Sequence, residues 1–193
     1  MKKNGQGTDR ELWAAFQRGD EEAYMGLYVQ YVHHLYEYGM FRYRDKAFVE
    51  DVIHDFYLHL WRSRERLSEV SAIFPYLLKA FRRFLYASAK KQSQDVNLSD
   101  TMVVTGAGGS TEHPADTAQV RDKRFHAVQR ALPQLHDKQQ EIIHFKFYEG
   151  LSYAEIGDIM GLDAKAVYNL MFQALKQLRK YMGLLWFGIF MAP

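Results

Sequence analysis

Residues 153–172 read YAEIGDIMGLDAKAVYNLMF, and this stretch decides the class of fold. Two helices that cross closely at a tight turn need a small residue where they touch and a glycine in the turn. Gly157 and Gly161 stand at these two positions, and the apolar residues Val167 and Leu170 follow in the second helix. The spacing is typical of a helix-turn-helix, whose second helix enters the major groove of DNA. A plain helical hairpin that binds no DNA is the alternative interpretation.

Capping signals mark where these helices begin. Ser152 and Glu155 form a capping-box pattern before the first helix, and Asp163 can cap the second, which we expect to run beyond residue 178. Upstream, Asp137 and Gln140 form a similar pattern at the start of another apolar helix. The apolar residues expected to form the helices and the small core of this block are Phe125, Val128, Leu132, Ile142, Ile143, Phe147, Ile156, Met160 and Leu162.

The outer face of the second helix carries the side chains that we expect to meet DNA. Asn and Gln can pair with adenine, and Lys can pair with guanine or phosphate. Because this face is only weakly basic, we expect this helix to bind DNA firmly only with the help of a partner protein or a second DNA contact. An interpretation in which several of these side chains are only solvated is equally open. The predicted DNA-binding residues of this helix are Lys165, Tyr168, Asn169, Phe172, Gln173 and Lys176.

Composition divides the chain into two blocks. Residues 93–119 contain four Asp or Glu, no Lys or Arg and a Gly-rich run, which is typical of a flexible linker. Residues 1–92 and 120–193 each have a net charge of +3, so a nucleic-acid partner is permitted but not required. We expect an all-α chain with domains at 1–92 and 120–181, an acidic linker between them, and an apolar tail at 182–193.

Several classes of function are disfavoured. The chain has no cysteine, which excludes a disulfide framework and a cysteine nucleophile and fits a reducing cytoplasm. No catalytic constellation and no phosphate-binding glycine loop is found. Residues 1–10 lack the apolar run of a secretory signal. The sequence therefore predicts a cytoplasmic protein that is not an enzyme and has no cofactor.

The first block has helical periodicity throughout. Asp20 is a candidate N-cap, and Glu21 and Glu22 follow in the first turn, where the helix dipole favours acids. Pro75 suits the start of a later helix. No segment alternates with a period of two, so no strand is expected. The expected apolar stripes are Ala23, Tyr24, Leu27, Tyr28, Tyr31, Val32 and Leu35, then Phe48, Val49, Val52, Ile53, Phe56, Leu60 and Trp61, and then Leu77, Leu78, Phe81, Phe84 and Leu85.

Residues 71–91 combine five cations with aromatic residues and contain no acid. This combination suits single-stranded DNA, because cations follow the phosphates and aromatic faces accept unstacked bases. The alternative is an amphipathic helix with core aromatics and solvated cations. The cations are Lys79, Arg82, Arg83, Lys90 and Lys91, of which the first four are predicted DNA-binding residues, and the aromatic residues are Phe74, Tyr76, Phe81, Phe84 and Tyr86.

The helix expected over residues 48–61 carries acidic residues on one face, in contrast to the basic residues at 71–91. Asp51, Asp55 and His59 recur every four residues on one face, and His54 lies beside them. A metal site within a helical bundle needs further carboxylates from other helices, so no metal site is predicted. A solvated acidic face and a protein-docking face remain as alternatives.

Three segments follow one another in an order that can be compared with known families. They read VEDVIHDFYLHLW at 49–61, YLLKAFRRFLYASAKK at 76–91 and LPQLHDKQQEIIHFKFYEGLSYAEIGDIMGLDAKAVYNLMFQALKQLR at 132–179. The chain resembles the extracytoplasmic-function (ECF) group of bacterial sigma factors, of the sigma-70 family, over residues 20–91 and 124–179.

The resemblance implies a factor that binds core RNA polymerase, recognises and opens the −10 element with its first block and reads the −35 element with its second. It places Asp51, His54 and Asp55 on the polymerase-docking face. His54 stands where the family usually has Gln, and Arg83 aligns where many members have Asn. An anti-sigma factor is a further implied partner. The alternatives are a stand-alone helix-turn-helix regulator and a helical interaction module that binds no DNA.

Residues 183–193 lie beyond the resemblance and read GLLWFGIFMAP. A membrane-spanning helix needs about 20 apolar residues, so no integral membrane span is expected. Our hypothesis is a helical continuation packed on the protein's own domains. The alternatives are a docking site for an inhibitor or polymerase and, following Lys176, Arg179 and Lys180, a membrane-surface contact.

Overall fold

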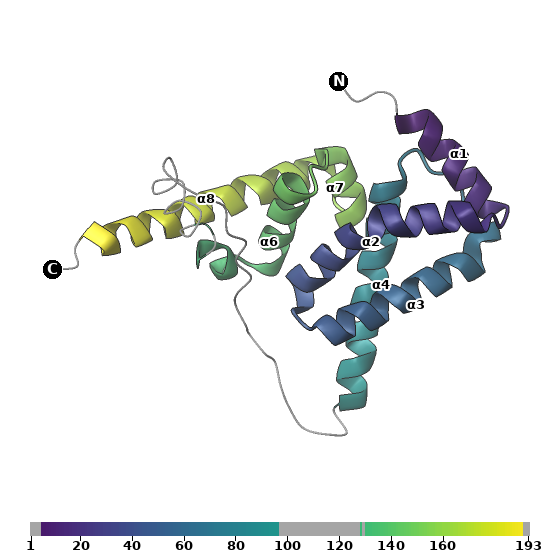
Figure 1. The fold of residues 1–193 in the computed structure, drawn as a ribbon. Helices are drawn as coiled ribbons and strands as arrows, with labels where there is room; N and C mark the ends of the chain where they lie inside the picture. Colours follow the sequence, from purple (N-terminus) through teal and green to yellow (C-terminus); the bar gives the residue numbers. More distant parts are fainter. Residues whose placement is uncertain (1–4, 97–127, 129, 191–193) are drawn as a thin grey trace, which may run out of the picture. The chain divides into compact units, whose positions relative to one another are not determined.

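A computed structural model of the chain describes residues 5–96, 128 and 130–190, and it describes the side chains of residues 9–93, 128 and 130–182. Every regular element within these ranges is helical (Figure 1). The chain divides into two compact units, one within residues 1–106 and one within residues 107–193. The fold class predicted from sequence is therefore confirmed.

The first unit is a helical bundle in which α2 and α3 form a hairpin and α4 packs against both (Figure 1). Its α1 was not expected from sequence, because no capping signal precedes it. This helix buries Trp13 and Phe16, and the Trp13 indole N–H donates a hydrogen bond to the carbonyl of Ser68 at 3.0 Å. The elements are α1 (Gly5–Gln17), α2 (Glu21–Tyr43), α3 (Lys46–Ser63), the 3-10 turn η1 (Arg64–Arg66) and α4 (Ile73–Val96).

The boundaries of these helices follow local side chains. Asp20 caps α2 as predicted, since its Oδ1 accepts a hydrogen bond from the Ala23 N–H at 3.0 Å. α4 begins at Ile73, two residues before Pro75, which therefore lies in the first turn of the helix. The first N–H groups of a helix have no partner within the helix, so the missing N–H of proline breaks no hydrogen bond there. α4 continues to residue 96, so residues 93–96 are helical and not linker. The rest of the expected linker up to residue 119 lies outside the described residues.

The core of the first unit follows the predicted stripes, with corrections at their edges. Tyr28 is 37% exposed, and its ring packs sideways on the buried Tyr57 with 4.8 Å between centroids. Phe84 is half-buried against Phe56. A large ring at the edge of an apolar stripe can pack against the core with one face while its other face stays in solvent, which explains the partial exposure. The other predicted positions that are half-buried instead of buried are Tyr24, Val32, Phe48 and Trp61.

The second unit contains the predicted helix-turn-helix, with one helix start displaced. The N-cap of α6 is His136, whose N–H donates to the Gln139 side chain at 3.2 Å, so the cap lies one residue before the predicted Asp137. Asp137 instead occupies the first turn, where its charge still suits the helix dipole. The elements are the 3-10 turn η2 (Leu132–Gln134), α6 (Asp137–Ile143), the π-helical turn η3 (His144–Tyr148), α7 (Tyr153–Met160) and α8 (Ala164–Phe190).

The core predicted for this unit is wrong around the π-helical turn η3. A π turn holds one more residue than an α turn and so rotates the residues that follow it. His144 and Phe145 are buried, whereas Phe147, expected in the core, is 62% exposed. Met160, Leu162 and Leu170 are half-buried, as are Val128 and Leu132, and Phe125 lies outside the described residues. The other buried positions not anticipated are the apolar residues Ala131, Leu135, Leu151, Ile159, Met171 and Ala174 and the polar residues Gln139 and Glu141.

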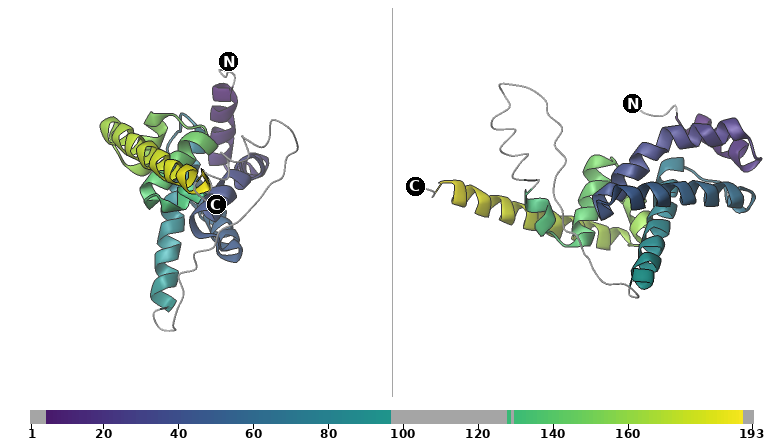
Figure 2. Two further views of the ribbon diagram at one scale, coloured as in Figure 1. Left: turned by 90° about the vertical axis from the view of Figure 1, so that its left-hand side faces the viewer. Right: turned by 60° about the horizontal axis from the view of Figure 1, so that its bottom comes forward.

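The last helix is long. α8 continues through residues 183–190, and its C-terminal part extends past α6 and α7 (Figure 2). The side chains of the apolar tail lie outside the described residues, so its expected packing stays a prediction. Among the described residues, none of the helices is both long enough and apolar enough to cross a membrane.

Candidate nucleic-acid and polymerase interfaces

The turn between α7 and α8 has the geometry that the sequence predicts. The Glu155 Oε2 accepts a hydrogen bond from the Ser152 N–H at 2.7 Å, and the Ser152 Oγ accepts one from the Glu155 N–H at 3.3 Å. Gly161 ends α7 at φ +68°, a left-handed conformation that favours glycine. A Cβ on Gly157 would lie 2.8 Å from the carbonyl oxygen of Leu162, so only glycine permits this crossing. These local features fix the direction of α8.

α8 begins at a side-chain cap and divides into two faces. The Asp163 Oδ1 accepts a hydrogen bond from the Ala166 N–H at 2.7 Å, as predicted. Val167, Met171 and Ala174 are buried in the unit. All six residues predicted to meet DNA are exposed on the same helix: Lys165, Tyr168, Asn169, Phe172, Gln173 and Lys176.

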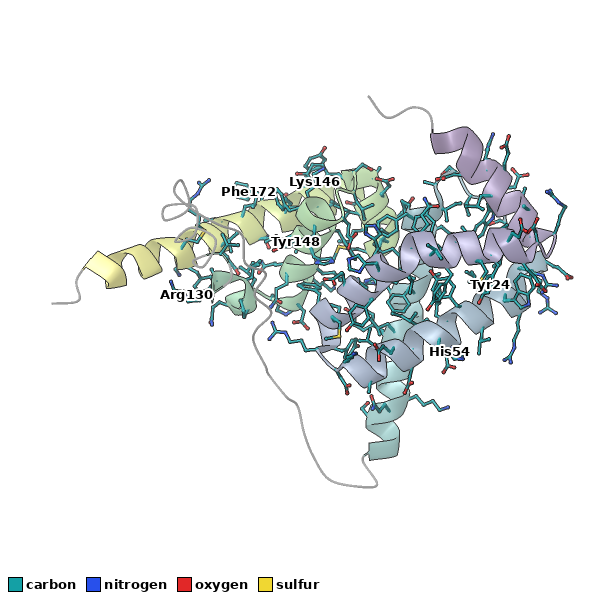
Figure 3. All side chains as sticks on the ribbon, viewed as in Figure 1. Tyr24, His54, Arg130, Lys146, Tyr148 and Phe172 are labelled. Carbon is teal, nitrogen blue, oxygen red and sulfur yellow. The ribbon has the colours of Figure 1, made fainter. Side chains whose placement is uncertain are left out.

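The exposed face of α8 is more apolar than the sequence interpretation emphasised. Tyr168 is 57% exposed, Phe172 is 67% exposed and Leu175 is 39% exposed (Figure 3 labels Phe172). Apolar side chains on a groove-reading helix can contact the methyl group of thymine. The face therefore offers apolar contacts as well as hydrogen bonds to a DNA groove.

A side-chain array from the preceding elements supports Tyr168. The Tyr153 ring lies 4.6 Å from the Tyr168 ring between centroids. The Lys146 Nζ lies 4.9 Å from the centroid of Tyr153 and donates a hydrogen bond to the Leu151 carbonyl at 3.0 Å. Sequence reasoning missed Lys146 and Tyr153, because their contact joins the π-helical turn η3 to α7 and leaves no local pattern in the sequence. The Tyr168 ring thus contacts its own unit while its side chain stays 57% exposed.

On α4, the apolar and charged residues point to different sides. Leu77, Leu78, Phe81 and Leu85 are buried. The predicted DNA-binding cations are exposed or half-buried: Arg83 and Lys90 are exposed, as is the neighbouring Lys91, and Lys79 and Arg82 are half-buried.

The aromatic side chains of α4 contact other rings of the same unit. Phe74 stacks on Tyr31 with 5.9 Å between centroids, and Tyr76 meets the edge of Trp13 at 5.2 Å. The Arg82 guanidinium lies 5.1 Å from the centroid of Tyr86. These rings pack within the unit. The side chains of α4 that could contact a nucleic acid are therefore mainly its cations.

The acidic face of α3 is exposed as a block. Asp51, His54 and Asp55 all face solvent (Figure 3 labels His54), and Leu58, 37% exposed, adds an apolar position that the sequence interpretation did not include. Within the described part of the chain, neither Asp51 nor Asp55 has an ion-pair partner. No group of His, Asp or Glu among those residues is arranged to hold a metal ion. The carboxylates are thus available to cations of another molecule.

A cluster of tyrosines lies beneath these surfaces. Burial, assisted by Tyr28, Tyr24 and Tyr31, raises the pKa of Tyr57 well above the usual value. Burial, with the nearby Asp9 carboxylate, raises the pKa of Tyr31 to about 12. These phenols stay neutral at physiological pH and act as packing groups.

Comparisons with known proteins point to one family. Residues 125–178 match the family model described as sigma-70, region 4. The chain is 28% identical over 166 residues to the ECF RNA polymerase sigma factor SigK of Mycolicibacterium vanbaalenii, covering 85% of this chain and 84% of that protein. It is 28% identical over 170 residues to the ECF RNA polymerase sigma factor BldN of Streptomyces coelicolor, covering 88% of this chain and 64% of that protein.

Solved structures agree on the fold. CnrH in complex with the cytosolic domain of CnrY superposes with a TM-score of 0.63 at 18% identity, covering 91% of this chain and 97% of that one. The sigma factor RpoE in complex with the anti-sigma factor NepR from Bartonella quintana also gives 0.63 at 18% identity, covering 81% and 94%.

Proposed function

Because this chain belongs to the ECF group of sigma-70 factors, we propose that it binds core RNA polymerase and directs the recognition and opening of promoters. The observation that carries the proposal is the capped helix-turn-helix whose exposed α8 face lies inside the matched region 4. The factor acts in the cytoplasm by binding, and it catalyses no reaction of its own.

The second unit is proposed to read the −35 element as duplex DNA. Asn169 and Gln173 can each make paired hydrogen bonds to adenine, and Lys165 and Lys176 can contact guanine or phosphate. The exposed Tyr168 and Phe172 add apolar contacts. With two cations among its six proposed contact residues, this face holds phosphates weakly, so its affinity for free duplex is expected to be low.

The first unit is proposed to hold the melted −10 element. The cations Lys79, Arg82, Arg83 and Lys90 can follow the phosphates of a single strand along α4. Since most aromatic side chains of α4 pack inside the unit, we assign strand binding mainly to these cations.

The acidic face of α3 is proposed to dock on core polymerase through Asp51, His54 and Asp55. Unpaired carboxylates on a rigid helix favour a basic partner surface and a fast encounter. The exposed Leu58 would supply an apolar contact beside them.

An anti-sigma factor is a further proposed partner. Two of the solved structures with this fold are complexes, one of CnrH with CnrY and one of RpoE with the anti-sigma factor NepR. The stand-alone regulator is less well supported, because it leaves the acidic face of α3 and the basic stripe of α4 without a role.

The docking proposal can be tested by titrating labelled core polymerase with the purified chain. Asp51→Ala combined with Asp55→Ala should weaken binding about tenfold or more, because two charge contacts are lost. The matched control is Glu50→Ala combined with Glu65→Ala, which removes two exposed acids whose partners, Lys46 and Arg64, belong to the same unit. Equal affinity of both double variants would refute docking through this face.

A further inference from the structure

The buried part of α8 ends about halfway along the helix. Val167, Met171 and Ala174 are buried, but no described side chain after Ala174 is. Residues 178, 181 and 182 are half-buried, and the others between 175 and 180 are exposed. The yellow end of α8 extends past the other helices of its unit in Figures 1 and 2. Among the described side chains, the fully buried face of α8 therefore ends at Ala174.

The part of α8 after Ala174 begins with a cluster of cations. Lys176, Arg179 and Lys180 lie within five residues and are all exposed. From Ala164 to the end of the chain there is no Asp or Glu. Within the described residues the three cations have no ion-pair partner. The cluster therefore favours an anionic ligand.

The segment that follows is uncharged and strongly apolar. Residues 183–190 read GLLWFGIF and continue α8 as a helix. A helix that is apolar on all sides is stable only in apolar surroundings. Eight residues of helix measure about 12 Å, whereas the hydrocarbon layer of a membrane is about 30 Å thick. The segment can enter a bilayer surface but cannot cross the bilayer.

Cations followed directly by Leu, Trp and Phe are typical of helices that lie in the membrane interface. The cations meet anionic headgroups, and the aromatic and aliphatic side chains enter the boundary with the acyl chains. Packing on the protein's own domains explains the apolar segment, but it gives no role to the exposed Arg179 and Lys180, which lie beyond the residues proposed to contact DNA. We propose that residues 176–190 form a site that binds anionic lipid surfaces.

This site goes beyond the function proposed above. It requires neither polymerase nor promoter DNA, so the two proposals can fail separately. Its occupant is a lipid surface, and an intramolecular or protein occupant is an alternative outcome of the test.

The test uses the full chain with vesicles of phosphatidylglycerol and phosphatidylethanolamine, compared with vesicles of phosphatidylcholine alone, in a flotation assay. The chain should float with the anionic vesicles only. Lys176→Glu combined with Arg179→Glu and Lys180→Glu should lower the partition coefficient by at least about a hundredfold, because each lost cation costs about fivefold and each new carboxylate is repelled by the anionic surface. Truncation after residue 182 should abolish flotation.

Two controls separate this site from general effects. Arg10→Glu combined with Arg18→Glu and Arg66→Glu makes the same change in net charge at exposed positions of the first unit and should leave flotation unchanged. Lipids with brominated chains should quench the fluorescence of the wild type but not of Trp186→Phe. No flotation with anionic vesicles, or flotation that persists after truncation, would overturn the proposal. Protection of Trp186 from a soluble quencher in the absence of vesicles would also overturn the proposal, because it would show that the tail packs on protein.

Discussion

Gly157 and Leu162 approach each other so closely that a Cβ on the glycine would lie 2.8 Å from the leucine carbonyl oxygen. The same Cβ would lie 3.4 Å from Val167 Cγ2. Backbone cannot move aside as a flexible side chain can, so the α7–α8 crossing depends on the absence of a side chain here. The crossing in turn sets how α8 presents its exposed face.

Gly157→Ala should therefore destabilise the second unit. We expect a loss of about 1–3 kcal/mol, the usual cost of forcing extra atoms into a packed contact. Denaturant unfolding followed by circular dichroism measures this loss. A variant as stable as the wild type would show that the two helices can separate at no cost.

The first unit offers a matched pair of glycines on α2. A Cβ on Gly39 would lie 2.6 Å from Val49 Cγ1, whereas a Cβ on Gly26 would meet only Leu12 Cδ1, at 3.5 Å. Gly39→Ala should lower the free energy of unfolding by about 1–3 kcal/mol. Gly26→Ala should raise it by about 0.5–1 kcal/mol, because alanine is the better helix former. Changes of the same sign in both variants would contradict the α2–α3 packing.

The buried tyrosines predict alkaline unfolding of the first unit. Burial raises the pKa of Tyr31 from its ordinary 10.0 to about 12, so the folded state favours the neutral phenol. The stability from this preference is complete below pH 10.0 and is lost as the pH rises toward 12. Melting temperatures measured across this range should fall, and they should fall less in Tyr31→Phe. Identical profiles for the two proteins would contradict the assignment to Tyr31.

The exposed face of α8 makes separate predictions for base and phosphate contacts. Asn169→Ala should cost about 1–3 kcal/mol on the preferred promoter and relax selection at one base pair. Lys165→Ala should weaken binding to all sequences and reduce the salt dependence. These effects are measured with the polymerase complex on promoter variants. Lys138→Ala, an exposed cation on α6, is the control, and an equal effect there would argue against an α8 interface.

Much of the second unit was predictable because its determinants are local. The Ser152–Glu155 capping box, Gly161 and the Asp163 cap each act within a few residues, so the sequence places them directly. The same is true of the exposed face of α8. The roles of the exposed residues in binding DNA or polymerase stay predictions.

The features missed from sequence depend on contacts between distant residues. α1 is held by Trp13, which donates to a carbonyl 55 residues later and meets Tyr76, and no local pattern records either contact. The π-helical turn that exposes Phe147 and brings Lys146 to Tyr153 changes the helical period within an apolar run. A periodicity argument assumes a constant period and so cannot locate such a change.

The most direct test of the central claim is run-off transcription with core polymerase and fragmented genomic DNA from the source organism, with and without this protein. Our account predicts new discrete transcripts that disappear with Asp51→Ala combined with Asp55→Ala and persist with Glu50→Ala combined with Glu65→Ala. The absence of factor-dependent transcripts, together with tight duplex binding by the protein alone, would contradict it and favour a stand-alone regulator.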